Sequence, residues 1–233
     1  MIELKNIKSH FPIFQHHPDL VYLDNAATTQ KPKSVIDAIS SFYEKENANI
    51  HRGIYPLAVS ASQRYEAVRG KVAQFLNAES ADEIVYTSGT TASINLVAHS
   101  FLSPRLEAGD EVIISVMEHH ANLIPWQMTC KNAGAHLRVI PMNQLGELDL
   151  TAFKNMLSSK VKMVAITHIS NSLGTINPIA AMIDLAHQNN IPILVDGAQS
   201  VAHYPIDLQA LEVDFFTFSG HKLFGPTGIG ILY

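Results

Sequence analysis

The sequence predicts an α/β fold in which helices flank a seven-stranded, mostly parallel sheet. Three observations support this prediction. Apolar, strand-like runs alternate along the chain with helical patterns. Most of these runs lie about twenty to thirty residues apart, as strand–helix–strand crossovers require. The 233 residues, 47% of them hydrophobic, are enough to bury one large core.

The amino-terminal part of the chain is predicted to form an arm and helices rather than sheet. Residues 1–20 are interpreted as an N-terminal arm and residues 21–233 as the main domain. The only strand candidate before residue 84 is the short apolar segment 21–23. Between residues 57 and 78, apolar side chains recur at steps of three and four, which predicts a helix with one apolar face: Ala61, Tyr65, Val68, Val72, Phe75 and Leu76.

Apolar runs rich in β-branched and aromatic residues are predicted to form the seven strands. They cover residues 84–87, 111–116, 136–142, 161–167, 191–195, 213–218 and 228–233. A helix is expected to begin near Ala92, and Cys130 lies on another predicted helix. Pro178 is expected to open a further helix that runs to about Asn189, because proline is favoured at the first helical position.

Composition and charge argue against several classes of function. The net charge is −5, the pI is near 6.2, and Lys and Arg are scattered, so neither nucleic acid nor an anionic membrane is expected as a partner. No segment has the apolar core of a signal peptide or the length of a membrane span, so a cytoplasmic location is expected. Cys130 is the single cysteine, which excludes an internal disulfide and a multi-cysteine metal site.

A small-residue turn follows the first predicted strand. Gly89, Thr90 and Thr91 lead into the apolar helix near Ala92. The free N–H groups, hydroxyls and positive dipole end of such a helix start would suit a phosphate group. An ordinary helix cap is an equally good interpretation of these residues, because Ser and Thr are favoured there.

Asp196 ends a fully apolar strand in the segment ILVDGAQS. A carboxylate at that depth costs several kcal/mol unless it is paired, so a cation or a strong donor should meet it. A backbone turn could supply the donor, and so could a protonated ring nitrogen of a ligand. Gln199 offers a neutral donor for an oxygen on the same ring.

Two further predicted strands are followed by polar side chains. His119, in MEHHANLIPWQ, could lie flat against an aromatic ligand. A metal site with His120 is not expected, because neighbouring histidines seldom reach one ion and no HExxH pattern is present. Asn171, in ITHISNSLG, could contact the same ligand or serve as a turn residue.

Lys222 follows the sixth predicted strand in the segment FSGHKLFGPTG. In an open α/β sheet, ligands bind in the crevice beyond the carboxyl ends of the strands. A lone lysine beside glycines is more often a surface residue in a turn. A phosphate cradle, a carboxylate for a ring nitrogen, a stacking imidazole and a lysine together indicate pyridoxal 5′-phosphate, which a lysine binds as a Schiff base.

The chain also resembles a known family over residues 21–233. Seven segments are similar, in the same order, to the signatures of class V aminotransferases, and specifically of the Suf-type (group II) cysteine desulfurases: YLDNAATTQKP, NIHRGIYPLA, TSGTTASINLVA, EHHANLIPWQ, HISNSLGTINP, VDGAQSVAH and FSGHKLFGPTGIGILY. The resemblance implies the large domain of a fold-type I pyridoxal-phosphate enzyme. It also implies an antiparallel last strand and a homodimer with sites near the interface.

The resemblance implies a role for each matched residue. Lys222 would carry the cofactor covalently, while Thr91, Ser219 and His221 would hold its phosphate beside the backbone of Thr90.

The cofactor ring is implied to have its own set of contacts. Asp196 would pair with the pyridine nitrogen, Gln199 would contact the phenolic oxygen, and His119 would stack on the ring. Asn171 would contact a ring oxygen and the substrate carboxylate. Two residues are implied to lie near the substrate, His51 and Arg52. No metal is implied.

In this family, L-cysteine displaces the lysine, and the freed amine removes the α-proton. A cysteine thiolate on a mobile loop then attacks the substrate sulfur, which leaves an enzyme persulfide and alanine. The sulfur supplies iron–sulfur cluster assembly through an acceptor protein that the sequence does not identify.

The chain departs from the family pattern in one respect. The nucleophilic cysteine and the arginine that binds the substrate carboxylate lie beyond the lysine in the family, in a carboxyl-terminal region. The chain ends soon after Lys222, and Cys130 is interpreted as a buried structural thiol. The chain is therefore predicted to be a piece that lacks the small domain and does not complete the reaction alone.

Three functions remain open at this point. The first is the cysteine desulfurase, and the second keeps the cofactor with another substrate, as in a selenocysteine lyase or another class V lyase or aminotransferase. The third is a truncated, non-catalytic chain that serves as a partner.

Overall fold

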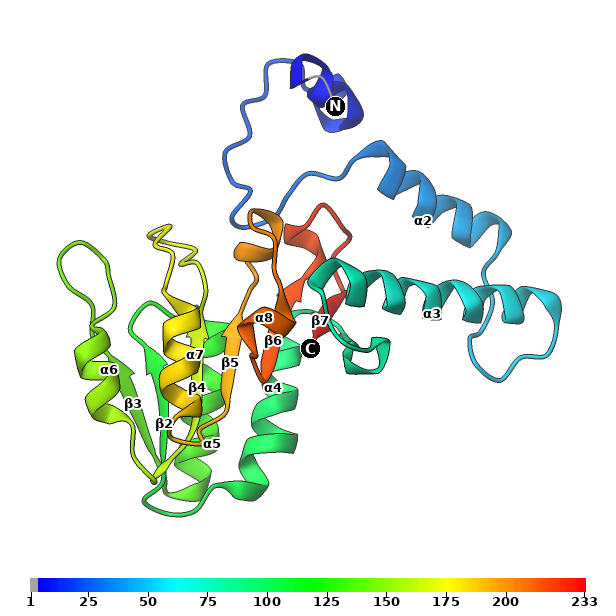
Figure 1. The fold of residues 1–233 in the computed structure, drawn as a ribbon. Coiled ribbons are helices and arrows are strands. Elements are labelled where there is room, and N and C mark those ends of the chain that lie inside the picture. Colours follow the sequence, from blue (N-terminus) through cyan, green and yellow to red (C-terminus); the bar gives the residue numbers. More distant parts are fainter. Residues whose placement is uncertain (1–3) are drawn as a thin grey trace.

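The structure is a computed structural model that describes residues 4–233 as helices packed on one mixed sheet (Figure 1). The strands are β1 Val85–Thr87, β2 Glu111–Ser115, β3 His136–Ile140, β4 Val161–Thr167, β5 Ile193–Asp196, β6 Phe215–Ser219 and β7 Gly230–Leu232. The α-helices are α1 Ile13–His16, α2 Lys33–Lys45, α3 Pro56–Leu76, α4 Thr90–Leu96, α5 Ile124–Ala133, α6 Leu150–Met156, α7 Ile179–His187 and α8 Leu208–Leu211.

Short 3₁₀ and π turns complete the described elements. They are η1 Leu4–His10, η2 Ala81–Glu83, η3 Val97–Leu102, η4 Ser103–Arg105, η5 His120–Asn122, η6 Ser200–Ala202 and η7 Gly220–Lys222. The π turn η3 continues α4 without a break. None of the helices described over residues 4–233 is both long and apolar enough to cross a membrane.

The seven strands have the order β1-β7-β6-β5-β4-β2-β3. The neighbours from β6 through β5, β4 and β2 to β3 are parallel, while β7 is antiparallel to both β1 and β6. The expectation of a seven-stranded, mostly parallel sheet with an antiparallel last strand is confirmed. Because the parallel strands end at the same edge, the polar residues that follow β2, β4, β5 and β6 come together there.

Both faces of the sheet are buried. Alternate residues of β4 pack on opposite sides, because side chains of a strand point alternately to its two faces. Val164 and Ile166 belong to the core that α7 covers, whereas Met163 and Ala165 belong to the core that contains Trp126 of α5. Strands with two buried faces are nearly all apolar, which is why the apolar runs could be located from the sequence.

The amino-terminal part differs from the prediction in one way. Residues 21–23 form no strand, and Val21 and Leu23 are 73% and 87% exposed. The helix at 57–78 is present as α3, but Val68 and Phe75 of its apolar face are about half exposed.

The reason is that α3 projects away from the sheet on the side of β7, with α2 beside it (Figure 1). Its buried residues are mostly small, namely Ala58, Ala61, Ala73 and Leu76.

Candidate functional site

A cavity of about 440 Å³ opens at the carboxyl edge of the parallel strands. Nine of the residues selected from the sequence line it: Thr90, Thr91, His119, Asn171, Asp196, Gln199, Ser219, His221 and Lys222. They come from the ends of β5 and β6, the start of α4 and the loops after β2 and β4. Residues that are far apart in the sequence therefore meet in one place.

One end of the cavity is formed by the start of α4. The Thr90 N–H donates a hydrogen bond to Ser219 Oγ at 2.8 Å, and the two hydroxyls of this pair are also 2.8 Å apart. Gly89 has φ +149°, and a Cβ on Gly230 would lie 2.4 Å from the Gly89 Cα. The two glycines let the turn lie directly against β7, so Thr90 and Ser219 meet at the cavity lining.

The floor of the cavity is Asp196, which is 4% exposed at the end of β5. Its Oδ1 accepts a hydrogen bond from the Ala198 N–H at 2.9 Å, while Oδ2 accepts none from the described residues. Burial raises the pKa of Asp196, against the lowering effects of the Ala198 hydrogen bond and the positive charges of Lys222 and His119. The free oxygen is suited to a cationic N–H donor of a ligand.

Lys222 lies in η7, directly after β6. Burial lowers the pKa of its amine, and the Asp196 carboxylate partly opposes this shift. A larger fraction of the amine is therefore neutral near neutral pH than in a solvent-exposed lysine. A neutral amine in a cavity can act as a nucleophile toward a carbonyl group or as a base.

One wall of the cavity is built by the loop after β2. His119 Nδ1 accepts a hydrogen bond from the Ala121 N–H at 3.1 Å, so the proton of the neutral ring is on Nε2. The preceding residue, Glu118, accepts hydrogen bonds from Ser115, Asn122 and the Thr167 N–H. Loss of water around the Glu118 carboxyl raises its pKa to about 7.

The segment 24–31 contributes Asp24, Ala26 and Ala27 to the cavity lining and binds the loop that carries Lys222. The His221 carbonyl oxygen accepts hydrogen bonds from the Thr29 N–H at 3.0 Å and from Lys31 Nζ at 2.9 Å. Gln199 Nε2 donates to the Ala26 carbonyl at 2.7 Å. These contacts hold the lysine loop between the sheet edge and the amino-terminal segment.

His51 and Arg52, expected near the substrate, do not line this cavity. They precede α3, where the His51 N–H donates to Ser62 Oγ at 2.7 Å and the His51 ring lies edge-on to Tyr65 with centroids 5.4 Å apart. His51 has φ +74°, a left-handed conformation that is uncommon outside glycine.

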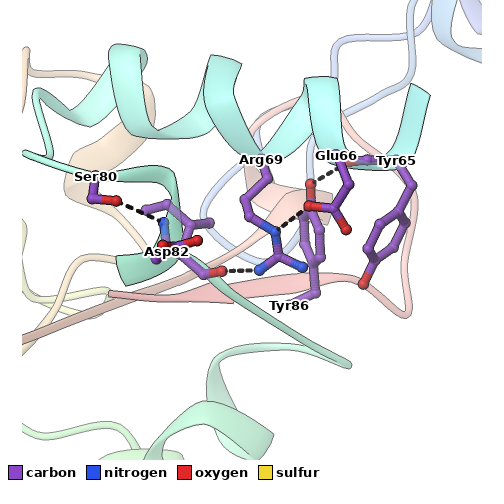
Figure 2. Close-up of polar contacts among 7 residues, drawn as sticks. Tyr65, Glu66, Arg69, Ser80, Asp82 and Tyr86 are labelled. Carbon is purple, nitrogen blue, oxygen red and sulfur yellow. Dashed lines mark hydrogen bonds and ion pairs between the residues drawn. The ribbon is translucent and has the colours of Figure 1, made fainter. Parts of the chain in front are cut away.

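The part of α3 that carries Tyr65 is fixed to β1 by an arginine. The Arg69 guanidinium lies 4.8 Å from the Tyr86 ring centroid and 5.6 Å from that of Tyr65, and it donates to Glu66 and to the Ile84 carbonyl (Figure 2). The Tyr86 hydroxyl donates to the Tyr65 carbonyl at 3.1 Å. The residues before α3 are thus oriented by an anchored helix rather than by the cavity.

The single cysteine is separate from the site. Cys130 is 2% exposed in α5, and burial raises the pKa of its thiol to about 11. The interpretation of Cys130 as a buried thiol is confirmed, and the thiolate that a nucleophile needs is disfavoured there. Among the described residues, no three His, Cys, Asp or Glu side chains cluster as metal ligands.

Several site residues were not selected from the sequence. Asp24, Ala26 and Ala27 line the cavity, although their segment was recognised only as part of a signature. Glu118 also escaped selection. A carboxylate shortly after a buried strand is similar to the signal that selected Asp196, and Glu118 follows β2 in the segment MEHHAN.

The comparisons with known proteins agree with this geometry. Residues 21–233 match the model of the family described as aminotransferase class-V. The chain is 51% identical over 236 residues to a cysteine desulfurase of Escherichia coli strain K12 and 52% identical over 233 residues to one of Cronobacter sakazakii. These matches cover 100% and 99% of the chain but only 58% and 57% of the relatives.

Solved structures agree over the same part. A cysteine desulfurase of Escherichia coli with an S-sulfonic acid superposes with a TM-score of 0.91 and 43% identity, and the apo enzyme of Thermococcus onnurineus with 0.93 and 37%. Both comparisons cover all of this chain and 58% and 57% of those chains. The chain therefore belongs to the class V aminotransferase family, whose members depend on pyridoxal 5′-phosphate.

Proposed function

We propose that the chain is the cofactor-binding part of a cysteine desulfurase that converts L-cysteine to L-alanine and passes the sulfur on. The observation that carries the proposal is the meeting of the Lys222 amine and the free Asp196 oxygen in one cavity. The 51% identity to a cysteine desulfurase supports the choice of substrate class.

The cavity fits pyridoxal 5′-phosphate by the chemistry of its donors. Thr91 at the start of α4, Ser219 and His221 line the cavity and offer hydroxyls and an imidazole for the phosphate, beside the positive end of the helix dipole. The unpaired Asp196 oxygen offers an acceptor for a protonated ring nitrogen. His119 offers a flat imidazole that can stack on the face of the cofactor ring, and Gln199 offers a polar group that can contact a ring oxygen.

When bound, pyridoxal 5′-phosphate supplies an aldehyde that reacts with amines and a ring that withdraws electrons from the substrate α-carbon. Asp196 keeps the proton on the ring nitrogen, because its buried carboxylate is stabilised by that positive charge. The Lys222 amine, whose pKa is lowered by burial, accepts the α-proton of the substrate. Asn171, an exposed residue of the lining, orients the substrate carboxylate.

Sulfur transfer also needs a nucleophilic thiolate, and none of the lining residues is a cysteine. Cys130, the single cysteine, is buried in α5. We therefore propose that residues 1–233 bind the cofactor but do not complete sulfur transfer by themselves. The burial of Cys130 also favours a second candidate function, in which the chain binds pyridoxal 5′-phosphate without catalysing desulfuration. Selenocysteine is an alternative substrate of the whole protein.

The proposed protein is a homodimer that passes sulfur to an acceptor protein for iron–sulfur cluster assembly, in the cytoplasm. Support for the dimer comes from apolar side chains that stand in solvent around α2 and α3, namely Ile36, Ile39, Tyr43, Ile54, Leu57 and Val59. Patches of this kind mark protein interfaces. The free thiol of Cys130 is compatible with a reducing compartment.

The direct test is a visible spectrum of residues 1–233 after addition of pyridoxal 5′-phosphate and removal of the excess. We expect a borohydride-trappable absorption band that is absent in Lys222→Ala. Lys160→Ala, at a lysine outside the cavity, should keep the band. A folded wild-type chain without the band, or a band that survives in Lys222→Ala, would refute the assignment of Lys222.

A further inference from the structure

A chain of hydrogen bonds runs from the core of α5 to the wall of the cavity. The Trp126 indole Nε1–H donates to Asn122 Oδ1 at 2.9 Å, and Asn122 Nδ2 donates to Glu118 Oε2 at 2.6 Å. The other oxygen, Glu118 Oε1, accepts from the Thr167 N–H at 2.9 Å and from Ser115 Oγ at 2.5 Å. Trp126 and Asn122 are both 0% exposed.

The direction of this chain is fixed at both ends. An indole N–H can only donate, so Asn122 must turn its oxygen toward Trp126 and its amino group toward Glu118. The Thr167 backbone N–H also can only donate. Glu118 therefore has to accept hydrogen bonds on both oxygens, which an ionised carboxylate does and an amide cannot.

The two ends that Glu118 joins are parts of the site. It follows β2 and directly precedes His119, and it binds the last residue of β4, Thr167. Both His119 and Thr167 line the cavity. Asp196, on the next strand, is close enough for its charge to act on Glu118. The Glu118 carboxylate thus joins the end of β2 to the end of β4, next to the position where His119 lines the cavity.

We propose that Glu118 is a positioning residue, which clamps the ends of β2 and β4 together so that His119 is held as a fixed wall of the cofactor cavity. Glu118 does not line the cavity itself and acts through its neighbours. The effect on pyridoxal 5′-phosphate rests on the proposed function, whereas the clamp itself does not depend on it.

The proposal makes a specific demand on substitutions. In Glu118→Gln, one oxygen is replaced by an amino group that faces the Asn122 amino group, and Asn122 cannot turn over without losing its bond to Trp126. Adding Asn122→Asp removes this conflict. The carboxylate introduced at position 122 would accept from both the Trp126 indole and the amide introduced at position 118, the shape is kept, and the net charge is unchanged.

The experiment compares four chains: wild type, Glu118→Gln, Glu118→Gln/Asn122→Asp, and Phe153→Leu. The last weakens the packing of α6, a helix that covers the sheet beside β3, and is a control for general loss of stability. Hydrogen exchange of the indole N–H is measured without cofactor, and it belongs to Trp126 because the chain has one tryptophan. The affinity for pyridoxal 5′-phosphate is then measured from its visible absorbance at pH 8.

We expect Glu118→Gln to speed indole exchange and to weaken cofactor binding, each by about tenfold or more, and the double variant to return both to within about threefold of wild type. Phe153→Leu should change neither by that amount at temperatures where it is folded.

Unchanged indole exchange in Glu118→Gln would overturn the clamp, and so would failure of the double variant to recover. A loss of affinity in Phe153→Leu equal to that in Glu118→Gln would overturn the positioning role. If wild type binds no cofactor while indole exchange follows the expected order, the clamp stands and the proposed function fails.

Discussion

At the scale of single residues, the cavity and its immediate surroundings contain ionisable groups whose pKa values are shifted by burial. Burial raises the pKa of Asp196 and Glu118 and lowers that of Lys222. Shifted pKa values gather at functional sites because such groups must bind or move protons near neutral pH. Cys130 shows the opposite outcome, since its raised pKa removes it from chemistry at that pH.

The raised pKa of Glu118 predicts a pH-dependent stability. Its ordinary value of 4.5 rises to about 7 on folding, so the folded protein binds the proton more tightly between these values. The stabilisation is therefore complete below about pH 4.5 and is lost as the pH rises through about 7. Neighbouring Asp196 acts in the same direction, because its negative charge also raises the pKa of Glu118.

We expect the free energy of unfolding of wild type to fall relative to Glu118→Gln between pH 5 and about pH 7.5. Urea unfolding of wild type and Glu118→Gln at several pH values gives the difference between their free energies of unfolding. Groups that titrate equally in both proteins do not contribute to this difference. A difference that stays constant over this range would show that Glu118 titrates at its ordinary pKa.

At the scale of elements, the site depends on segments that hold each other at the sheet edge. Thr29 Oγ1 donates to the His221 carbonyl at 3.0 Å and accepts from the Phe224 N–H at 2.9 Å. Phe224 has φ +61°, so its backbone is strained and needs such support. The segment 28–31 is therefore packed on the lysine loop through these hydrogen bonds, although almost two hundred residues separate the two in the sequence.

We expect Thr29→Val to loosen the lysine loop, because the substitution leaves the Phe224 N–H without its partner at a local cost of roughly 1–3 kcal/mol. Hydrogen exchange of residues 220–225, followed by mass spectrometry, should become faster. Thr151→Val on the exposed part of α6 is the matched control, since the Thr151 side chain makes no hydrogen bond with any residue of the described part, 4–233. Equal exchange in wild type and Thr29→Val would contradict the support role.

The close approach of β7 to the turn before α4 gives a second test at this scale. A Cβ on Gly230 would lie 2.4 Å from the Gly89 Cα and 2.8 Å from its nitrogen, which are backbone atoms that cannot move aside cheaply. We expect Gly230→Ala to displace the turn and to weaken pyridoxal 5′-phosphate binding by about tenfold or more.

Gly70→Ala in α3 is the control, because its added Cβ meets no atom within 4 Å. It should leave cofactor binding unchanged and stabilise the chain by about 1 kcal/mol, since alanine favours a helix interior. Titration with cofactor and thermal unfolding of both variants give the two quantities. Wild-type affinity in Gly230→Ala would mean that the turn does not need its contact with β7.

At the scale of the whole molecule, the amino-terminal helices and the sheet differ in how well their apolar side chains are buried. The sheet and its two cores are close-packed, whereas α2 and the first half of α3 carry apolar side chains in solvent. Ile54 is 96% exposed and Tyr43 is 68% exposed. Such a surface is stable when another chain covers it.

We expect residues 1–233 to form dimers or larger assemblies through this surface. Multi-angle light scattering should show a smaller mass for Ile36→Glu/Ile39→Glu on α2 than for wild type, because buried charges oppose association. Val139→Glu, at an exposed position of β3, should keep the wild-type mass. A monomeric wild type, or an assembly that survives the α2 substitutions, would show that this face is not the interface.

The central part of the sheet was predictable because strands such as β2, β4 and β5 are buried on both faces. A strand such as β4 must be largely apolar, and residues 161–167 show this locally in the run from Met163 to Ile166. The apolar face of α3 is only partly buried, with Ala61 and Leu76 covered and Phe75 exposed, because periodicity shows which residues share a face but not whether anything covers it. The segment 21–23 failed for the same reason, since an apolar residue does not by itself create a neighbouring strand.

The sequence alone determined the order of strands and helices, the segments at which polar residues follow strands, and the resemblance to a family. The tertiary structure alone decided which of these residues meet: it gathered nine of them in one cavity and left His51 and Arg52 beside α3. It also bonded Glu118 to Thr167 and Thr29 to the lysine loop. The physical reason is that strand formation depends on nearby side chains, whereas the site depends on hydrogen bonds and close approaches between residues that only the folded sheet edge brings together.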